Sequence, residues 1–431
     1  SVSGNKLGGM LPSELWSSTI IHSKLTRLEL HNNDFSGPLP KELFEDSSKL
    51  HALSVSSNGF NGALPSEIAL ATSLTFLSLS VNELDSAIPT EIGDLTVLRS
   101  LFADDVALKG TIPTEMGKMT ALEILSMRYN SLNGSIPTEF GELTAVQTLE
   151  IDNNLLTGSL PDELQHMSSL VAFFWYRNKI TGPLPPSFSN LPDIETLNGA
   201  YNDHTGKIPT EWGELSILVE LNLGVNYRLN SSIPTEFGNL KNLHDLYLNH
   251  TNACGRIPTE IGDMEELLVF RGMNSYLTGP IPTEIGKLTA MLDFEVRLNK
   301  LNGTLPTEIG EMHNLMTLLV DRNDLTGTLP TEMGENSRLR RLYTYYNELC
   351  GTVPSEWAVL TRLGSVPDDC RDQRDYECHL TVSDQYIAVL RNRFEHVIPT
   401  TIVEQCTIVI PDPPAPPPSP PPSPPPSPPP S

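Results

Sequence analysis

Apolar and polar positions recur along this chain with a fixed period. A Leu/Ile/Val-Pro step returns throughout most of the sequence, and eleven of the fourteen intervals between its successive prolines are 24 residues long. The prolines of this step are Pro12, Pro40, Pro65, Pro89, Pro113, Pro137, Pro161, Pro185, Pro209, Pro234, Pro258, Pro282, Pro306, Pro330 and Pro354. Such a strict period predicts a solenoid, in which each repeat forms one turn that stacks on its neighbours.

Each repeat contains a segment in which apolar and polar side chains alternate. In residues 125–130, Leu125 and Met127 are apolar, whereas Ser126 and Arg128 are polar. This alternation predicts a short β-strand with one buried and one exposed face. We expect the strands of stacked turns to pair into a parallel sheet that lines one face of the solenoid.

An asparagine closes the predicted strand in twelve of the fifteen turns. These residues are Asn5, Asn33, Asn58, Asn82, Asn130, Asn154, Asn178, Asn202, Asn226, Asn299, Asn323 and Asn347, with Val106, Thr251 and Ser275 in the other three turns. A buried amide at a bend can bond to backbone groups of its own turn and of the adjacent turn, which cost about 1–3 kcal/mol each when unpaired. We therefore predict a ladder of structural asparagines.

The second half of each repeat predicts a glycine turn followed by a short helical segment. In residues 133–141, Gly134 precedes Ile-Pro137, and a proline at a helix start loses no hydrogen bond. The glutamate two places later falls where the helix dipole favours an acid, and it is present in fourteen turns, with Ser187 the exception. Calcium bridging between turns or molecules is a second interpretation of this acidic column. We expect Gly93, Gly117 and Gly141 to end their segments.

The unit LxxLxxLxLxxNxLxGxIPxEIGxL, seen in residues 122–143, resembles the plant-specific class of leucine-rich repeat. The repeated IPTEIG segment resembles large secreted repeat proteins of microalgae. The resemblance spans residues 1–365 and implies an α/β right-handed superhelix with a parallel sheet on the concave face and short helices or 3-10 turns outside. The class includes receptor-kinase ectodomains and polygalacturonase-inhibiting proteins, but this fold serves many functions.

The two ends of the repeat region give further expectations. Residues 1–5 align with the second half of a strand and no polar cap precedes them, so we expect more repeats, a cap and a signal peptide upstream. By resemblance to secreted members of the class, we expect residues 366–410 to form a cysteine-containing C-terminal cap. Residues 400–410 are rich in β-branched side chains and predict one or two strands.

Four cysteines cluster at this end, and the resemblance implies two disulfides among Cys350, Cys370, Cys378 and Cys406. Sequence alone leaves their pairing open. A zinc site is the alternative, although neither a Cys-x-x-Cys motif nor metal-spaced histidines accompany the cluster. Cys254 shares the repeat position of Cys350 four turns earlier, about 19 Å away at ~4.8 Å per turn, beyond disulfide reach. We expect Cys254 to be free and buried, with a bond to another chain as the alternative.

Residues 411–431 have the composition PDPPAPPPSPPPSPPPSPPPS, which predicts a polyproline II rod of about 65 Å. The Ser-Pro-Pro-Pro unit resembles extensins, pherophorins and leucine-rich-repeat extensins, in which the prolines are hydroxylated and glycosylated. The resemblance assigns these modifications to Pro416, Pro417, Pro418, Ser419, Pro420, Pro421, Pro422, Ser423, Pro424, Pro425, Pro426, Ser427, Pro428, Pro429 and Pro430. A stiff linker is the alternative interpretation.

Asn-x-Ser/Thr sequons at Asn133, Asn230, Asn249 and Asn302 predict N-glycosylation. Together with the cysteines and the tail, they predict secretion to a cell wall, an extracellular matrix or a cell-surface filament. The formal net charge of −25 argues against nucleic acid and anionic membrane surfaces as partners, because like charges repel. The sequence has no run of 18 apolar residues, so we expect no membrane insertion.

The sequence shows no catalytic constellation, no cofactor motif and no convincing set of metal ligands. We interpret Asp104 and Asp105, on exposed strand positions, as solvated or calcium-contacting carboxylates. Calcium is therefore the one cofactor under consideration, and the chain is predicted not to be an enzyme.

The outward strand positions form the candidate ligand-binding face, because solenoids present a concave sheet to their ligands. Aromatic residues and arginines stand out there against an acidic background, and both kinds are enriched at binding hot spots. They are Arg128, Tyr129, Phe174, Tyr176, Arg177, Tyr201, Tyr247, Arg271, Arg297, Arg322, Tyr343, Tyr345 and Tyr346. The alternative is that exposed tyrosines simply suit strands.

Three functions follow from these observations. The main hypothesis is an extracellular structural glycoprotein of a wall, matrix or filament, since a scaffold selects uniform turns and the tail resembles wall proteins. Its partners would be other extracellular proteins, wall polysaccharides or further copies in a self-assembled structure. The second is a recognition module that binds a peptide or polysaccharide on its concave face. The third is an inhibitor of a foreign enzyme, for which no residue identifies a partner.

Overall fold

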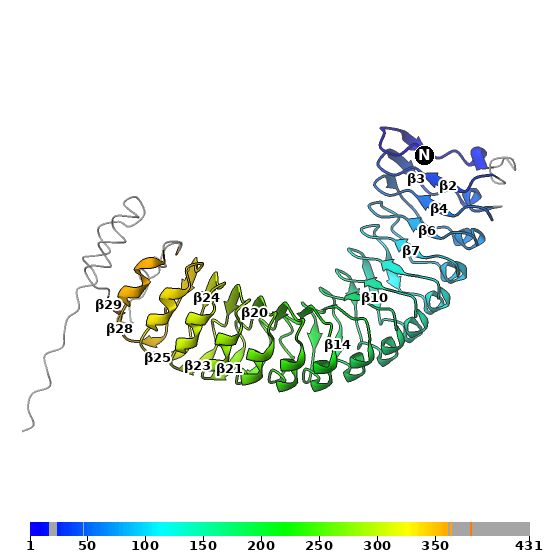
Figure 1. Cartoon of the computed structure of the whole chain (residues 1–431). Coiled ribbons are helices and arrows are strands. Elements are labelled where there is room, and N and C mark those ends of the chain that lie inside the picture. Colours follow the sequence, from blue (N-terminus) through cyan, green and yellow to red (C-terminus); the bar gives the residue numbers. More distant parts are fainter. Residues whose placement is uncertain (17–23, 46, 361–362, 364–379, 382–431) are drawn as a thin grey trace, which may run out of the picture.

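The computed structural model describes residues 1–16, 24–45, 47–360, 363 and 380–381. Successive turns stack into an open arc, with short strands along its concave side and short helical segments along its outer side (Figure 1). The predicted leucine-rich-repeat solenoid is therefore confirmed. The tail, residues 411–431, and nearly all of the expected cap, residues 366–410, lie outside the described residues.

Fourteen short strands form the long parallel sheet, and each pairs with the strand of the next turn. They are β2 (Arg27–Glu29), β4 (Ala52–Ser54), β6 (Phe76–Ser78), β7 (Ser100–Phe102), β9 (Ile124–Ser126), β11 (Thr148–Glu150), β13 (Ala172–Phe174), β15 (Thr196–Asn198), β17 (Glu220–Asn222), β18 (Asp245–Tyr247), β20 (Val269–Arg271), β22 (Asp293–Glu295), β24 (Thr317–Leu319) and β26 (Arg341–Tyr343). The register is regular: the central leucine or phenylalanine of each strand lies opposite the central residue of the next, as Leu149 lies opposite Phe173. Equivalent repeat positions therefore form straight columns across the sheet.

A second set of parallel strands, two to four residues long, runs along one flank of the solenoid, just after the ladder position of most turns. They form the sets β1 (Gly8–Met10), β3 (Asp34–Gly37) and β5 (Gly59–Phe60); β8 (Lys109–Thr111), β10 (Ser131–Gly134) and β12 (Leu155–Leu156); β14 (Thr181–Gly182) and β16 (Asp203–His204); β19 (Cys254–Gly255), β21 (Tyr276–Gly279), β23 (Lys300–Gly303), β25 (Asp324–Gly327) and β27 (Glu348–Leu349); and β28 (Gly351–Thr352) with β29 (Leu380–Thr381). This second set of strands was not predicted from the sequence, because its segments are short and mostly polar.

The helical segment of each turn is a 3-10 helix. Within the described residues these segments are η1 (Ser13–Trp16), η2 (Lys41–Leu43), η3 (Ser66–Leu70), η4 (Thr90–Asp94), η5 (Thr114–Lys118), η6 (Thr138–Glu142), η7 (Asp162–His166), η8 (Pro186–Asn190), η9 (Thr210–Glu214), η10 (Thr235–Asn239), η11 (Thr259–Asp263), η12 (Thr283–Lys287), η13 (Thr307–Glu311), η14 (Thr331–Glu335) and η15 (Ser355–Val359). The proline precedes the helix in an extended conformation, as Pro137 does with φ −62° and ψ 136°. The glutamate follows in the first turn, as predicted.

The glycine of the IPTEIG segment has a different role from the one expected. Gly141 lies inside η6 rather than after it. A Cβ atom at Gly141 would lie 2.5 Å from the main-chain oxygen of Glu163 in the next turn. The glycine is therefore required because successive 3-10 helices approach each other closely, and not because the segment must end there.

The asparagine ladder is confirmed. The side-chain nitrogen of Asn154 donates to the carbonyl of Ile151 in its own turn (3.1 Å) and to that of Met127 in the preceding turn (2.9 Å). Its Oδ1 accepts from the backbone N–H of Leu132 at 3.0 Å. Each such amide thus ties two turns together through groups that would otherwise be buried and unpaired.

The core is one continuous column of buried apolar side chains that runs from Leu11 to Leu363. Its regular leucine positions are interrupted around Trp175, where Gly199 and His204 replace apolar residues in the following turn, and all three residues are buried. A Cβ atom at Gly199 would lie 2.2 Å from the Trp175 ring, so the missing side chain leaves room for the indole.

Candidate functional site

The concave face presents the side chains that alternate with the buried residues of each strand and of the bend after it. Tyr129, Arg177, Tyr201, Arg322 and Tyr346 are exposed on this side, as predicted. Half-buried members of the predicted set are Arg128, Phe174, Tyr176, Tyr247, Arg271, Arg297, Tyr343 and Tyr345. These residues lie along one surface, but they do not form a single patch, because they are spread from the sixth to the fifteenth turn.

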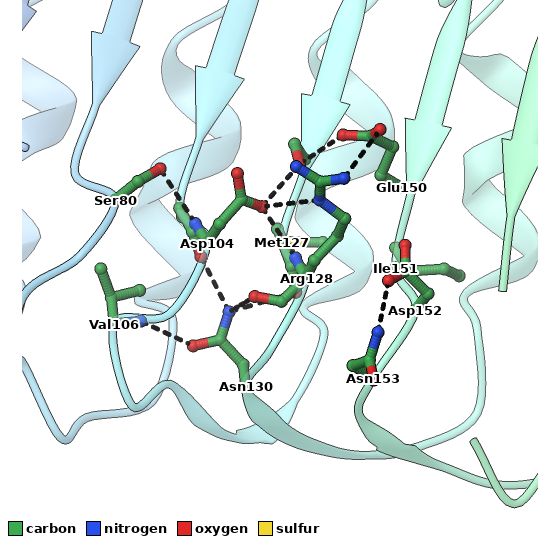
Figure 2. Close-up of polar contacts among 12 residues, drawn as sticks. Ser80, Asp104, Val106, Met127, Arg128, Asn130, Glu150, Ile151, Asp152 and Asn153 are labelled. Atoms are coloured by element: carbon green, nitrogen blue, oxygen red, sulfur yellow. Dashed lines mark hydrogen bonds and ion pairs between the residues drawn. The ribbon is translucent and has the colours of Figure 1, made fainter. Parts of the chain in front are cut away.

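Arg128 is held by acidic neighbours and does not project freely into solvent. Its guanidinium lies between Asp104 and Glu150, with Nε 3.8 Å from an Asp104 oxygen and Nη1 3.4 Å from a Glu150 oxygen (Figure 2). The hydroxyl oxygen of Ser126 lies 2.5 Å from an Asp104 oxygen and 2.7 Å from a Glu150 oxygen, so its one hydrogen can be donated to either carboxylate. Asp104 also accepts from the backbone N–H of Arg128 at 2.9 Å. The interpretation of Asp104 as a solvated carboxylate is therefore wrong, whereas Asp105 is exposed.

A second arginine occupies a similar position six turns later. Arg271 lies 3.7 Å from Asp293 and 3.6 Å from Glu295, and its guanidinium stands 5.4 Å from the centre of the Tyr247 ring. Arg341 adds a further contact to Asp293 at 3.7 Å. The sequence suggested arginines set against an acidic background, and the structure shows that acidic neighbours on adjacent strands hold two of them in place.

The residue just before each ladder position adopts a left-handed conformation. Tyr129, Arg177, Tyr201, Arg322 and Tyr346 have φ values of 55°, 51°, 56°, 56° and 54°. This conformation is unfavourable for bulky residues and is best tolerated by glycine and asparagine. Here it turns large side chains outward at the edge of the concave face, and two arginine–tyrosine pairs stack there: Arg177 on Tyr201 at 5.2 Å and Arg322 on Tyr346 at 4.6 Å. The sequence gave no sign of this conformation.

The concave face is hollowed between the sixth and tenth turns. The hollow has a volume of about 330 Å³ and is lined by Tyr129, Asn153, Tyr176, Arg177, Asn198, Ala200, Tyr201 and Asn222. It forms where the outward position before the bend carries the small side chain of Ala200, in the ninth turn. Three tyrosines, three carboxamides and one guanidinium can together bind a polar ligand that has some apolar surface.

A buried carboxylate lies beside this hollow. Asp152 is fully buried; its Oδ2 accepts from the side chain of Asn153 at 2.7 Å, and its Oδ1 has no hydrogen-bond partner within the described part of the chain. Burial raises the pKa of Asp152 above its usual range. Burial, and then the charge of Asp152, raise the pKa of Tyr176 to about 12, so this phenol remains a neutral hydrogen-bond donor.

The predicted modification sites occupy different surfaces. Asn133, Asn230 and Asn302 are exposed on the flank that carries the second set of strands, whereas Asn249 is half-buried on the concave face. The Asn249 Oδ1 would lie 2.8 Å from a Cβ atom at Gly224, which places this side chain beside the hollow. N-glycosylation at these four asparagines remains a prediction.

Cys254 is half-buried rather than buried, and its thiol lies 3.5 Å from Oδ1 of Asn230. Cys350 is exposed. The other predicted disulfide partners, Cys370, Cys378 and Cys406, lie outside the described residues, as do the predicted hydroxyprolines from Pro416 to Pro430. The cysteine pairing therefore remains a prediction.

The outer glutamate column has a local explanation. In most of these turns the preceding threonine donates to the glutamate, as Thr138 Oγ1 does to Glu139 at 3.3 Å and Thr331 Oγ1 does to Glu332 at 3.0 Å. Among the described residues, no group of three or more histidine, cysteine or acidic side chains is arranged to hold a metal ion. In the same part of the chain, no helix combines the length and apolar character that a membrane crossing requires.

The repeats match the family model described as Leucine Rich Repeat at residues 24–45, 121–143 and 145–167. This match and the stacked parallel strands define the chain as a leucine-rich-repeat solenoid. A comparison with curated protein sequences gave no match.

Among solved structures, the chain is similar to the plant peptide hormone receptor RGFR1 in complex with RGF2, with 32% identity and a TM-score of 0.75 over 84% of this chain and 61% of that one. It is also similar to the leucine-rich-repeat ectodomain of the receptor kinase GASSHO1/SCHENGEN3 from Arabidopsis thaliana, in complex with CASPARIAN STRIP INTEGRITY FACTOR 2. That match has 30% identity and a TM-score of 0.72 over 84% of this chain and 45% of the other. The Leptospira interrogans protein LIC12759 matches with 26% identity and a TM-score of 0.66 over 90% and 98% of the two chains. The chain thus spans less than two thirds of the two plant proteins.

Proposed function

We propose that this chain is an extracellular recognition module that binds a peptide along its concave face. The observation that carries the proposal is the contrast between its two surfaces. On the outer surface, the first turn of the 3-10 helix carries glutamate in fourteen of fifteen turns. On the concave surface, the position two residues before the ladder position varies. From the fifth to the twelfth turn it holds aspartate, arginine, tyrosine, alanine, glycine, asparagine and methionine. A concave surface that varies on a constant frame suits selective binding.

The regularity that favoured a wall scaffold has a structural cause. The ladder asparagines bond to the backbone of adjacent turns, and the glycines allow neighbouring 3-10 helices to approach. These constant positions are needed to stack any set of turns, so they no longer favour a scaffold over a receptor. The scaffold hypothesis then rests on the proline-rich tail, which lies outside the described residues.

The similar plant structures also support a role in ligand recognition. Both were solved with a bound partner, one of them a peptide hormone receptor with RGF2. By analogy with the ectodomain, we place the protein outside the cell. We place its ligand on the sheet side because that is the surface whose residues vary. The proposal includes no catalytic step.

The experiment is selection from a library of random linear peptides by the full chain, followed by titration of the enriched peptides. Peptides should be enriched, and Tyr201→Ser, on the concave face, should weaken their binding by about tenfold, the effect of removing a stacked aromatic contact. The control Glu236→Gln, on the outer column, should bind as the wild-type chain does. Failure to enrich any peptide, or equal loss in both variants, would overturn the proposal.

A further inference from the structure

Two acidic side chains lie next to each other near the hollow, on the concave side of the tenth and eleventh turns. Glu220 and Asp245 are directly opposite in the pairing of β17 with β18, and both are half-buried. Burial raises the pKa of Glu220, and the charge of Asp245 raises it further. The groups that bond to them are neutral: Asn198 donates to Glu220 at 3.3 Å, and the Tyr247 hydroxyl donates to Asp245 at 3.2 Å.

The other acidic pairs described on this face are bridged by an arginine. Arg128 lies between Asp104 and Glu150, and Arg271 contacts both Asp293 and Glu295. No arginine, lysine or histidine of the described residues lies within ion-pair distance of Glu220 or Asp245. Two like charges at a partly dry surface are unfavourable without a counter-charge. Among the described residues, Glu220 and Asp245 therefore have no arginine that plays the part of Arg128 or Arg271.

This pair adjoins the hollow. Asn222, which lines the hollow, follows Glu220 by two residues on the same strand face, a separation of about 7 Å. Ala200 forms part of the hollow's surface, whereas the Asn249 side chain lies against the neighbouring Gly224. The one guanidinium that lines the hollow belongs to Arg177, in the bend that follows β13 two turns earlier, where it stacks on Tyr201.

We propose that the hollow and the Glu220–Asp245 pair form one subsite for an arginine or lysine of the bound peptide. The charged end of that side chain lies between the two carboxylates and supplies the positive charge that Arg128 and Arg271 supply to their own acidic neighbours. Its aliphatic part lies against Asn222 and Ala200, because basic side chains cover apolar surface with their stems. The net charge of −25 attracts a basic peptide over longer distances. This inference rests on the proposed function and specifies the ligand's chemistry.

The test compares the composition of the peptides that different forms of the full chain select from the same random library. The wild-type chain should enrich peptides with a conserved arginine or lysine. Glu220→Gln combined with Asp245→Asn should still enrich peptides, but without that basic residue. The matched control, Glu236→Gln with Glu260→Gln, removes the same charge from the outer column of the same two turns and should retain the basic preference.

A double-mutant cycle then assigns the contact. Replacing the basic residue of an enriched peptide by norleucine should weaken binding to the wild-type chain by about tenfold or more, and should change binding to the neutralised variant by less than about twofold. Glu220→Lys with Asp245→Lys should select acidic peptides instead. Circular dichroism on heating confirms that each variant is folded.

The outcomes separate the two proposals. Enrichment of peptides that lack a basic residue would overturn the subsite and leave the proposed function standing. Loss of the basic preference in the outer-column control would show that net charge alone is responsible, and would also overturn the subsite. Enrichment of no peptide by any form would overturn both.

Discussion

The indole nitrogen of Trp175 donates a hydrogen bond to Nε2 of His204, 2.9 Å away, inside the core of the solenoid. Because Nε2 accepts, the neutral imidazole carries its proton on Nδ1. The ring planes meet at 80°, an edge-on arrangement with the centroids 6.2 Å apart. Gly199 leaves the space that the indole fills, so the two polar side chains are buried as a pair.

This pair predicts a specific dependence of stability on pH. Burial lowers the pKa of His204 from its ordinary 6.5 to about 4. Between these values the unfolded chain binds more protons than the folded chain, so stability is highest above about pH 6.5 and falls towards pH 4. The loss attributable to this group is about 3 kcal/mol.

Urea unfolding of the wild-type chain and of His204→Leu across this pH range measures the effect. Leucine is the reference because Leu132 and Leu156 occupy the equivalent position in earlier turns. The difference between the two unfolding free energies should change with pH, whereas carboxylate titrations are common to both proteins. Parallel pH profiles would contradict the assignment.

Adding a methyl group between adjacent 3-10 helices should destabilise the solenoid. Gly141→Ala places a Cβ atom 2.5 Å from the main-chain oxygen of Glu163, and overpacking of this kind costs about 1–3 kcal/mol. The seventh turn carries Gln165 at the equivalent position, so Gln165→Ala is a matched control that should change stability by less than about 0.5 kcal/mol. Denaturant midpoints measure both, and equal effects would show that the close approach is not the cause.

Removing one ladder asparagine should be more costly than replacing it with threonine. Asn154→Ala leaves the Met127 and Ile151 carbonyls and the Leu132 N–H without their amide partner, a loss of about 3 kcal/mol or more. Asn154→Thr should lose less, because Thr251 already serves at this position. Its hydroxyl donates to the Leu248 carbonyl at 2.7 Å and accepts from the Ala253 N–H at 3.1 Å. Equal destabilisation of the two variants would argue against hydrogen bonding as the origin of the column.

One valine on the concave edge should be replaceable with a gain in stability. Val81 has φ 59° and is half exposed, and a β-branched residue is strained in this conformation. Val81→Asn should therefore stabilise the chain by about 1 kcal/mol. Val97 is similarly exposed but is not among the residues with positive φ, so Val97→Asn should give no such gain. Thermal unfolding compares them, and the absence of a difference would contradict the strain argument.

Much of the fold was predictable because all turns share one repeated sequence pattern, so the structure predicted for one turn applies to the others. The strand, the ladder asparagine and the proline-led helix could be placed from alternation, spacing and known helix preferences, and the structure confirms them. Asn154 and Pro137 lie where the repeat placed them, although Pro137 precedes its helix and does not begin it.

The features that were missed depend on contacts between turns. The role of Gly141 follows from the distance to the next turn, and the ion pairs of Arg128 and Arg271 follow from which strands are adjacent. The hollow was not predicted for a related reason: it depends on the small side chain of Ala200, which no pattern of aromatic or charged residues indicates. A repeat sequence reports what is constant, whereas a binding surface depends on the exceptions.

The buried trio of Trp175, Gly199 and His204 limits how this chain can change its length during evolution. Most turns share a 24-residue spacing and interchangeable contacts, so recombination between repeats can insert or remove a whole turn without breaking the stack. A crossover between Trp175 and His204 would instead set the indole against an ordinary branched core residue and bury the imidazole without its donor. These two turns are therefore inherited as one block, and gain or loss of repeats is expected on either side of it.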